Sequence, residues 1–94
     1  PAFINCSIEN NHVDPNEYFT GAIDCDYQCS PILINTKINN NSAVTASAIT
    51  IYGGTLDEEV TLINCTISDN SNCGEGAIRQ LINTNLVMIN CILR

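Results

Sequence analysis

The cysteines are the first residues in this sequence whose types and spacing could do chemistry. Six cysteines in 94 residues favour an oxidising compartment. Cys25 and Cys29 lie four residues apart in a segment that we expect to be a loop, and this spacing fits a local disulfide. A zinc site would need two close pairs of cysteines, or cysteines with several histidines. The chain has one close pair and the single histidine His12, so we predict no metal and no other cofactor.

Acid–base chemistry would need carboxylates and a basic group gathered at one place. The candidates are Asp24, Asp26 and Arg79, where Asp24 and Arg79 occupy equivalent positions of the repeat described below. Two repeats of a stacked coil separate them by about 10 Å, too far for direct contact. The motifs of a nucleophile elbow, a phosphate loop and a helical zinc site are absent. We therefore predict no catalytic residues and expect these side chains to be solvated.

A repeated segment organises the whole chain. In each copy Ile precedes Asn, and these asparagines are 30, 29 and 26 residues apart: Asn5, Asn35, Asn64 and Asn90. A second motif, in which Ala-Ile follows Gly or Ser, recurs at 21–23, 47–49 and 76–78. A period of 20 to 50 residues is typical of solenoids, propellers and arrays. The repeats predict one domain over residues 1–94, with rungs near 1–30, 31–59, 60–85 and 86–94.

The pattern within one repeat indicates strands rather than helices. Val60 and Leu62 alternate with polar residues, the pattern shifts at Asn64, and Cys65 and Ile67 alternate again. Ile, Val and Thr dominate these runs, and they suit a pleated surface. Asn tolerates the left-handed backbone region, so it lets the chain turn a corner between strands. Further turns are expected at Asn10-Asn11, Asn40-Asn41 and Asn70-Ser71. Three short strands and three turns per repeat predict an all-β parallel β-helix of about 3.5 rungs of 26–30 residues.

The main alternative at this period is a leucine-rich repeat. Such a repeat would need a regular leucine frame and a helical half, and the sequence shows neither.

In a parallel β-helix, equivalent side chains lie one above the other, about 4.8 Å apart. The predicted inner columns are Phe3/Leu33/Leu62/Met88, Cys6/Thr36/Cys65/Cys91, Ile8/Ile38/Ile67/Leu93 and Ile23/Ile49/Ile78. The amides of Asn5, Asn35, Asn64 and Asn90 are predicted to form a ladder in which each is hydrogen-bonded to the next. The column Ile4/Ile34/Ile63/Ile89 is also apolar, and alternation alone does not decide whether it faces inward.

Three segments match the N-glycosylation sequon: 5–7, 40–42 and 64–66. Asn5 and Asn64 belong to the predicted ladder, where a glycan would conflict with stacking. Asn40 is therefore the acceptor that we predict.

The segment 64–71, followed by Gly76-Ala77-Ile78, resembles the right-handed parallel β-helix repeats of the pectate-lyase-like superfamily. It is similar in particular to the repeats of polymorphic outer-membrane proteins and related surface adhesins. The resemblance covers essentially the whole chain and implies a right-handed coil. It also implies an alternative function, a fragment of a polysaccharide-active enzyme whose catalytic rungs lie elsewhere.

Charge and the ends of the stack guide the expected partners. A net charge of −7 with three basic residues argues against nucleic acid and anionic membranes, and no apolar run is long enough to span a bilayer. Terminal rungs expose strand edges, which are templates for association. We expect an excerpt of a longer solenoid, whose partners are neighbouring rungs of the same chain or further copies, with glycans or a host surface as additional candidates.

The expected function follows from these observations. It is that of a non-catalytic structural solenoid of a secreted or surface protein, an adhesin stalk or a unit that self-assembles end to end.

Overall fold

The structure is a computed structural model, and it describes residues 1–17, 20–26, 28–53, 58–71, 74, 76–81 and 83–94. Every regular element within these residues is a β-strand, and the strands form three sheets. Sheet 1 contains β1 (Ala2–Ile4), β4 (Ile32–Ile34), β7 (Glu58–Ile63) and β10 (Thr84–Ile89). Sheet 2 contains β2 (Ser7–Glu9), β5 (Lys37–Asn39), β8 (Thr66–Ser68) and β11 (Ile92–Leu93). Sheet 3 contains β3 (Ile23–Cys25), β6 (Ile49–Ile51) and β9 (Ile78–Gln80).

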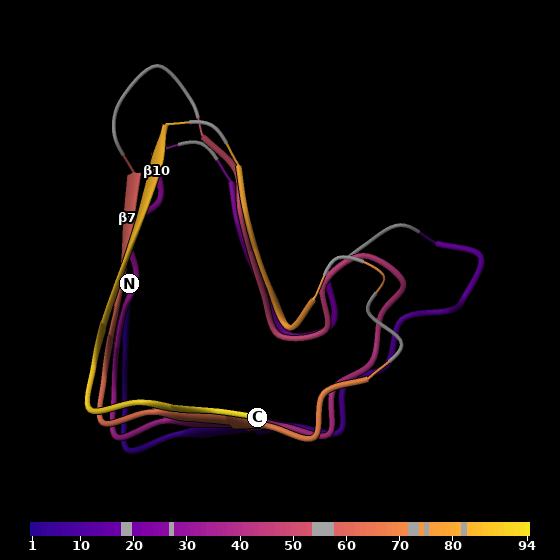
Figure 1. Ribbon diagram of the computed structural model, residues 1–94, viewed down its shortest axis with the longest axis horizontal. Coiled ribbons are helices and arrows are strands. Elements are labelled where there is room, and N and C mark those ends of the chain that lie inside the picture. Colours follow the sequence, from indigo (N-terminus) through magenta and orange to yellow (C-terminus); the bar gives the residue numbers. More distant parts are fainter. Residues whose placement is uncertain (18–19, 27, 54–57, 72–73, 75, 82) are drawn as a thin grey trace.

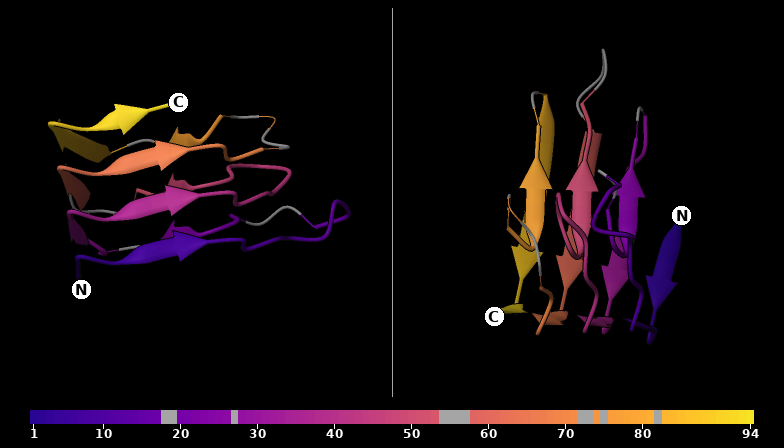
Figure 2. Two further views of the ribbon diagram at one scale, coloured as in Figure 1. Left: turned by 90° about the horizontal axis from the view of Figure 1, so that it is seen from below. Right: turned by 90° about the vertical axis from the view of Figure 1, so that its right-hand side faces the viewer.

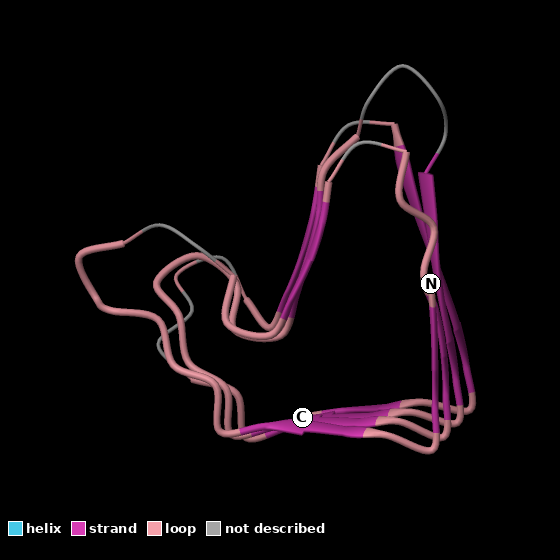
Figure 3. Cartoon of the chain, turned by 180° about the vertical axis from the view of Figure 1, so that it is seen from behind, coloured by secondary structure: helices cyan, strands magenta, loops and turns pink. Residues whose placement is uncertain are grey.

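The chain forms a coil, because successive strands belong to different sheets and pair only with their equivalents in neighbouring rungs. After β1 it passes through β2 and β3 before returning to β4, which lies beside β1 (Figure 1; Figure 3). Every strand pairing is parallel. In Figure 1 the chain runs counterclockwise while later rungs approach the viewer, so the coil is right-handed, and Figure 2 shows the rungs stacked in sequence order. The predicted right-handed parallel β-helix of three to four rungs is confirmed.

The register of the sheets aligns the predicted hydrophobic columns. Leu33 pairs with Phe3 on one side and Leu62 on the other, and Leu62 pairs with Met88. The members of the columns in the middle rungs are fully buried: Leu33, Ile38, Ile49, Leu62 and Ile67. Full burial of an aliphatic side chain contributes about 1.5–3 kcal/mol, so the middle rungs supply most of the hydrophobic stabilisation.

The isoleucine column that the sequence left undecided faces outward. Neighbouring residues of a strand point to opposite faces, and Leu33 and Leu62 point into the core. Ile34 and Ile63, which follow them, therefore lie on the outer face of sheet 1. At the two ends of this column Ile4 is 54% exposed and Ile89 is 51% exposed.

Left-handed backbone conformations turn the corners of the coil. The four repeat asparagines, which lie between sheets 1 and 2, have φ angles of 56°, 50°, 54° and 54° in sequence order: Asn5, Asn35, Asn64 and Asn90. After sheet 2 the equivalent positions are Asn10 (φ 63°), Asn40 (φ 54°) and Asp69 (φ 56°). Asn and Asp adopt this region more readily than other non-glycine residues, which explains why they recur at each corner.

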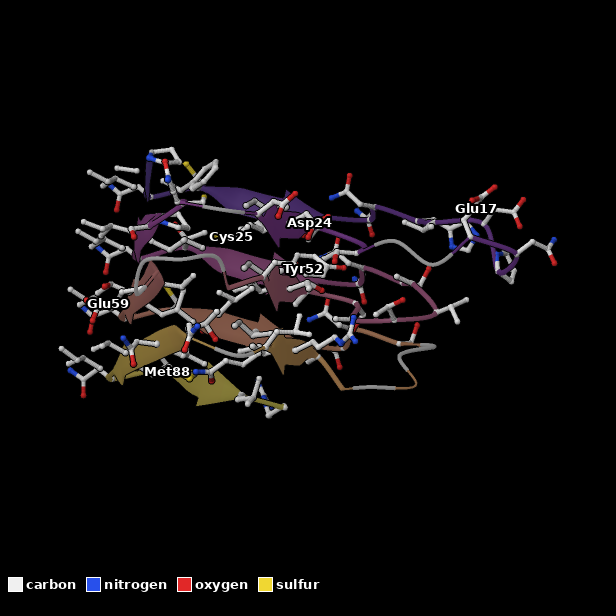
Figure 4. The ribbon with its side chains drawn as sticks, turned by 90° about the horizontal axis from the view of Figure 1, so that it is seen from above. Glu17, Asp24, Cys25, Tyr52, Glu59 and Met88 are labelled. Atoms are coloured by element: carbon white, nitrogen blue, oxygen red, sulfur yellow. The ribbon has the colours of Figure 1, made fainter. Side chains whose placement is uncertain are left out.

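The first inserted segment projects away from the stack, as Figure 4 shows for the loop that carries Glu17. Asp14 shapes this loop, since its Oδ1 accepts hydrogen bonds from the backbone N–H and Nδ2 of Asn16 at 2.9 and 3.1 Å. The second insertion, 53–59, lies largely outside the described residues. The described insertion thus leaves the stacked register intact.

Gly21 lies where the first rung closely approaches the backbone of the second. A Cβ atom at this position would lie 2.6 Å from the backbone oxygen of Ser47 and 3.2 Å from that of Ser42. Backbone oxygens cannot rotate away from such a contact, so the second rung would have to shift. The absence of a side chain at Gly21 therefore allows the first and second rungs to pack.

Gly21→Ala is expected to lower the free energy of unfolding by about 1–3 kcal/mol, measured by urea denaturation with circular dichroism. Gly74→Ala is the matched control, because its Cβ would lie 3.3 Å from the Val44 oxygen and needs a smaller adjustment. Equal losses in the two variants would contradict the argument from close approach.

Candidate functional site

The asparagines predicted to form a ladder stack at the corner between sheets 1 and 2. The backbone N–H of Asn5 donates to the carbonyl oxygen of Ile34 at 3.0 Å, and Asn35 and Asn64 make the equivalent bonds at 2.9 Å. The Nδ2 of Asn35 also donates to the Oδ1 of Asn5 at 3.2 Å. Among the described residues no side-chain bond links Asn64 to Asn35 or to Asn90. All four side chains are exposed, so this column serves chiefly as a backbone corner.

A second asparagine column, which the sequence analysis treated only as turns, forms a ladder through the interior. The Oδ1 of Asn41 accepts hydrogen bonds from the backbone N–H and Nδ2 of Asn11, both at 3.0 Å. The Oδ1 of Asn70 accepts the same two bonds from Asn41, at 2.9 and 3.0 Å. The Nδ2 of Asn41 also donates to the carbonyl oxygen of Ile8, and that of Asn70 to the carbonyl oxygen of Ile38, at 3.1 Å in each case.

Asn41 is completely buried, yet its amide oxygen accepts two bonds and its amide nitrogen donates two. A buried polar group that is fully satisfied in this way rigidifies its surroundings and fixes one arrangement of them. The spacing of the three residues, 30 and then 29, was a signal available in the sequence. We missed it because Asn70 was aligned with Asn10 and Asn40, whereas the structural equivalent of those two is Asp69.

The column that contains three cysteines has a polar role. Thr36, Cys65 and Cys91 each share one donor hydrogen between the carbonyl oxygen two residues earlier and a carbonyl oxygen of the preceding rung, at 3.1–3.4 Å. The acceptors are Phe3 and Ile34 for Thr36, Leu33 and Ile63 for Cys65, and Leu62 and Ile89 for Cys91. Hydroxyl and thiol groups therefore perform the same task, which is to tie the corner of one rung to the rung before it.

The Cys65 thiol is poorly suited to react at neutral pH. Burial raises its pKa above the ordinary value, the backbone hydrogen bond with Thr36 opposes this shift, and the neighbouring Cys91 adds to it. Nucleophilic attack and metal ligation require the thiolate, which a raised pKa disfavours. The column is thus a structural feature of the coil.

The predicted disulfide partners, Cys25 and Cys29, lie close together but are not joined in the structure. The Sγ of Cys25 donates to the carbonyl oxygen of Cys29 at 3.0 Å. Cys25 is buried against the core and Cys29 is half-buried. The disulfide stays a prediction for the oxidised chain. Cys73, for which no partner was predicted, lies outside the described residues.

The predicted glycan acceptor Asn40 is exposed at a left-handed corner (φ 54°), next to the buried Asn41. Its backbone N–H donates to the carbonyl oxygen of Ser68 at 3.4 Å. The exposure of Asn40 is compatible with a glycan, and glycosylation stays a prediction.

The acid–base candidates lie along sheet 3. Its register places Thr50 between Asp24 and Arg79, so a full rung separates the carboxylate from the guanidinium. Burial raises the pKa of Asp24 and the charge of Asp26 raises it further, whereas a hydrogen bond from Thr20 lowers it. The Oγ1 of Thr20 also lies 2.5 Å from the Oγ1 of the buried Thr50, whose hydroxyl can donate to it. This arrangement brings hydroxyl groups, not the carboxylate and the guanidinium, together.

His12 and Ser42 form a pair that the sequence analysis did not predict, with Nδ1 2.5 Å from Oγ. Serine and imidazole together form a nucleophile and its base, but catalysis also needs a group that orients the other ring nitrogen and donors for the oxyanion. In the described part of the chain no hydrogen bond reaches the other ring nitrogen of His12. The pair is therefore a polar contact between neighbouring rungs.

Metal ligands do not gather in the described part of the chain, where no three His, Cys, Asp or Glu side chains lie close enough to hold an ion. The same residues contain no helix long and apolar enough to cross a membrane.

Comparison with known proteins adds no further identification. No protein-family model matches the chain, and neither a curated protein nor a solved structure is similar enough to count as a match. The fold and its ladders define the chain as a parallel β-solenoid.

Asn41→Leu is expected to lower the free energy of unfolding by about 2–4 kcal/mol. It removes the side-chain partner of Asn11 and of the Ile8 carbonyl group, and one of the two donors to the Asn70 Oδ1. Asn40→Gly is the matched control in urea denaturation. Asn40 is exposed, and glycine adopts its backbone conformation without strain, so we expect a change within about 0.5 kcal/mol. A variant at Asn41 that is as stable as the parent would show that the ladder does not stabilise the coil.

Alkaline pH is expected to destabilise the protein through Cys65. Because its pKa is raised in the folded state, the unfolded chain loses this proton first, near the ordinary value of 9.0. The stabilisation is complete below that pH and is lost as the pH rises above it, with a slope of at most about 1.4 kcal/mol per pH unit. Cys65→Thr, which copies Thr36, should flatten this dependence in urea denaturation between pH 7 and about 10. If the parent protein and the Cys65→Thr variant lose equal stability over this pH range, Cys65 is not the cause of the alkaline destabilisation.

Proposed function

We propose that this chain is a structural segment of a secreted or surface solenoid, acting as an adhesin stalk or as a unit that stacks end to end. The observation that carries the proposal is that the core columns run to both end rungs of the structure. Phe3 and Ile8 at one end are half-buried, and Leu93 at the other is 52% exposed, whereas their equivalents in the middle rungs are fully buried. Contact with a further coil would bury these side chains.

The edges of the sheets support the same conclusion. In each sheet the first and last strands have one neighbour: β1 and β10, β2 and β11, and β3 and β9. An edge strand presents N–H and C=O groups that another strand of the same direction can bind. Further rungs, either of the same chain or of another copy, would pair with these edges.

The polar side chains of the interior also favour a structural role. Asn41, Thr36 and Cys65 direct their hydrogen bonds to neighbouring rungs. A site for chemistry would instead direct several polar groups to one point that a substrate can reach.

The proposed location outside the cell depends on chemistry rather than on geometry. Six cysteines favour an oxidising compartment, and Asn40 offers an exposed sequon. The resemblance of the repeats to surface adhesins agrees with this location, where the outward faces would contact glycans or a host surface.

The end-to-end part of the proposal is tested by two substitutions at equally exposed sites. Leu93 (52% exposed) belongs to an inner column that ends at the last rung, whereas Ile92 (51% exposed) faces outward on sheet 2. Leu93→Lys places a charge against the core of any coil stacked on this end, so we expect it to abolish elongated particles in light scattering and electron microscopy. Ile92→Lys should leave them intact. Loss in both variants, or no elongated particles in the parent protein, would contradict end-to-end stacking.

A further inference from the structure

The part of the outer face of sheet 1 that all four strands share is apolar except for Thr61. Its side chains come from alternate positions of the four strands, and we refer to them as the isoleucine face: Ala2, Ile4, Ile32, Ile34, Thr61, Ile63, Val87 and Ile89. Ile4, Ile32 and Ile89 are 54%, 43% and 51% exposed. A contiguous apolar patch on the surface of a soluble protein commonly marks a site of interaction.

Charged side chains lie around the isoleucine face but not within it. Glu59 is adjacent to Thr61, whose Oγ1 donates to the Glu59 carboxylate at 3.4 Å. The outward positions of the other sheets do carry charges, which include Glu9 and Lys37 in sheet 2 and Asp24 in sheet 3. A basic partner would therefore be attracted to those faces rather than to this one.

The net charge of −7 bears directly on a second copy as the partner. Two such chains repel each other wherever carboxylates would face one another. The isoleucine face reduces this repulsion, because none of its eight side chains is charged and the Glu59 carboxylate lies only at its edge, beside Thr61.

The period of the face also favours a second copy. Its ridges of β-branched side chains repeat at the strand spacing of about 4.8 Å, which another parallel stack of the same rungs would match at every rung. Sheets that pack face to face lie about 10 Å apart, with their side chains interdigitated. We propose that the isoleucine face pairs side by side with the same face of a second copy of this chain. This lateral contact is independent of the proposed stacking through the ends.

The size of the face determines how strong the pairing should be. Four strands and three to four residues along each give a patch of roughly 15–20 Å by 10–13 Å. This corresponds to roughly 150–260 Å² of surface per copy, against the roughly 800 Å² per partner of a stable complex. We therefore expect a dissociation constant of about 0.1–1 mM for the described rungs, which falls as rungs are added.

The experiment is sedimentation equilibrium of the chain carrying Leu93→Lys, which blocks stacking through that end, from about 20 µM to 2 mM. We expect a dimer whose dissociation constant rises at least tenfold when Ile34→Lys or Ile63→Lys is added. Thr66→Lys is the matched control, since Thr66 faces outward on sheet 2 and should not alter the equilibrium. Added salt should strengthen the dimer, because it screens the repulsion between two acidic chains. Circular dichroism verifies that each variant is folded.

A photo-crosslinking residue at position 61 identifies the surface that is paired. Crosslinks to strands of sheet 1 in the second copy support pairing through the isoleucine face, whereas crosslinks to strands of sheets 2 or 3 alone would indicate another contact and overturn the proposal. A protein that remains monomeric at 2 mM also overturns it. If that monomer binds neutral phosphatidylcholine vesicles and loses binding with Ile63→Lys, the face belongs to a lipid surface instead. End-to-end particles blocked by Leu93→Lys would leave the proposed function standing in either case.

Discussion

The whole structure depends on one constraint, the register between rungs. Backbone N–H groups of one rung donate to carbonyl oxygens of the next, as Asn64 does to Ile89 at 2.9 Å. Each side chain must therefore fit the equivalent side chains above and below it, about 4.8 Å away. The residue at any position must therefore suit the whole column of equivalent positions. The fully buried pairs of Leu33 with Leu62 and of Ile38 with Ile67 meet this requirement with identical side chains.

Polar groups can occupy the interior because the same constraint supplies their partners. The Asn41 amide is satisfied entirely by the rungs on either side and by the backbone. The hydroxyl of Thr36 and the thiol of Cys65 can occupy equivalent positions, because both are donors and the corner supplies carbonyl oxygens as acceptors. An unsatisfied buried amide would cost several kcal/mol, so these polar columns also exclude a shift of one rung against the next.

The sequence predicted the features that repeat and missed those that depend on side-chain geometry. The spacing of Asn5, Asn35, Asn64 and Asn90 was sufficient for the coil, its corners and its apolar columns, because register alone produces them. It did not decide the direction of Ile34 and its equivalents, because the alternation of inward and outward residues is interrupted at the asparagine corner.

The interior ladder and the polar contacts between rungs were harder to predict. The ladder of Asn11, Asn41 and Asn70 was hidden by an alignment wrong by one residue at Asp69. The contact of His12 with Ser42 joins residues 30 positions apart in segments that have no apolar repeat pattern to align them. The Thr50 hydroxyl and its partner Thr20 were missed for the same reason.

The interior asparagine ladder also makes the coil polar along its axis, because the hydrogen bonds between its asparagines all run in the same direction from rung to rung. The Oδ1 atoms of Asn41 and Asn70 accept from the preceding rung, while the backbone N–H and Nδ2 of Asn41 donate to the Asn70 amide of the following rung. By this pattern, a rung added before the ladder would donate to the Asn11 amide oxygen, and a rung added after it would accept from the N–H groups of Asn70. Two molecules that met through like ends would oppose acceptor to acceptor or donor to donor. The two ends of the coil are therefore chemically different, and the ladder continues only where the donor end of one molecule meets the acceptor end of another.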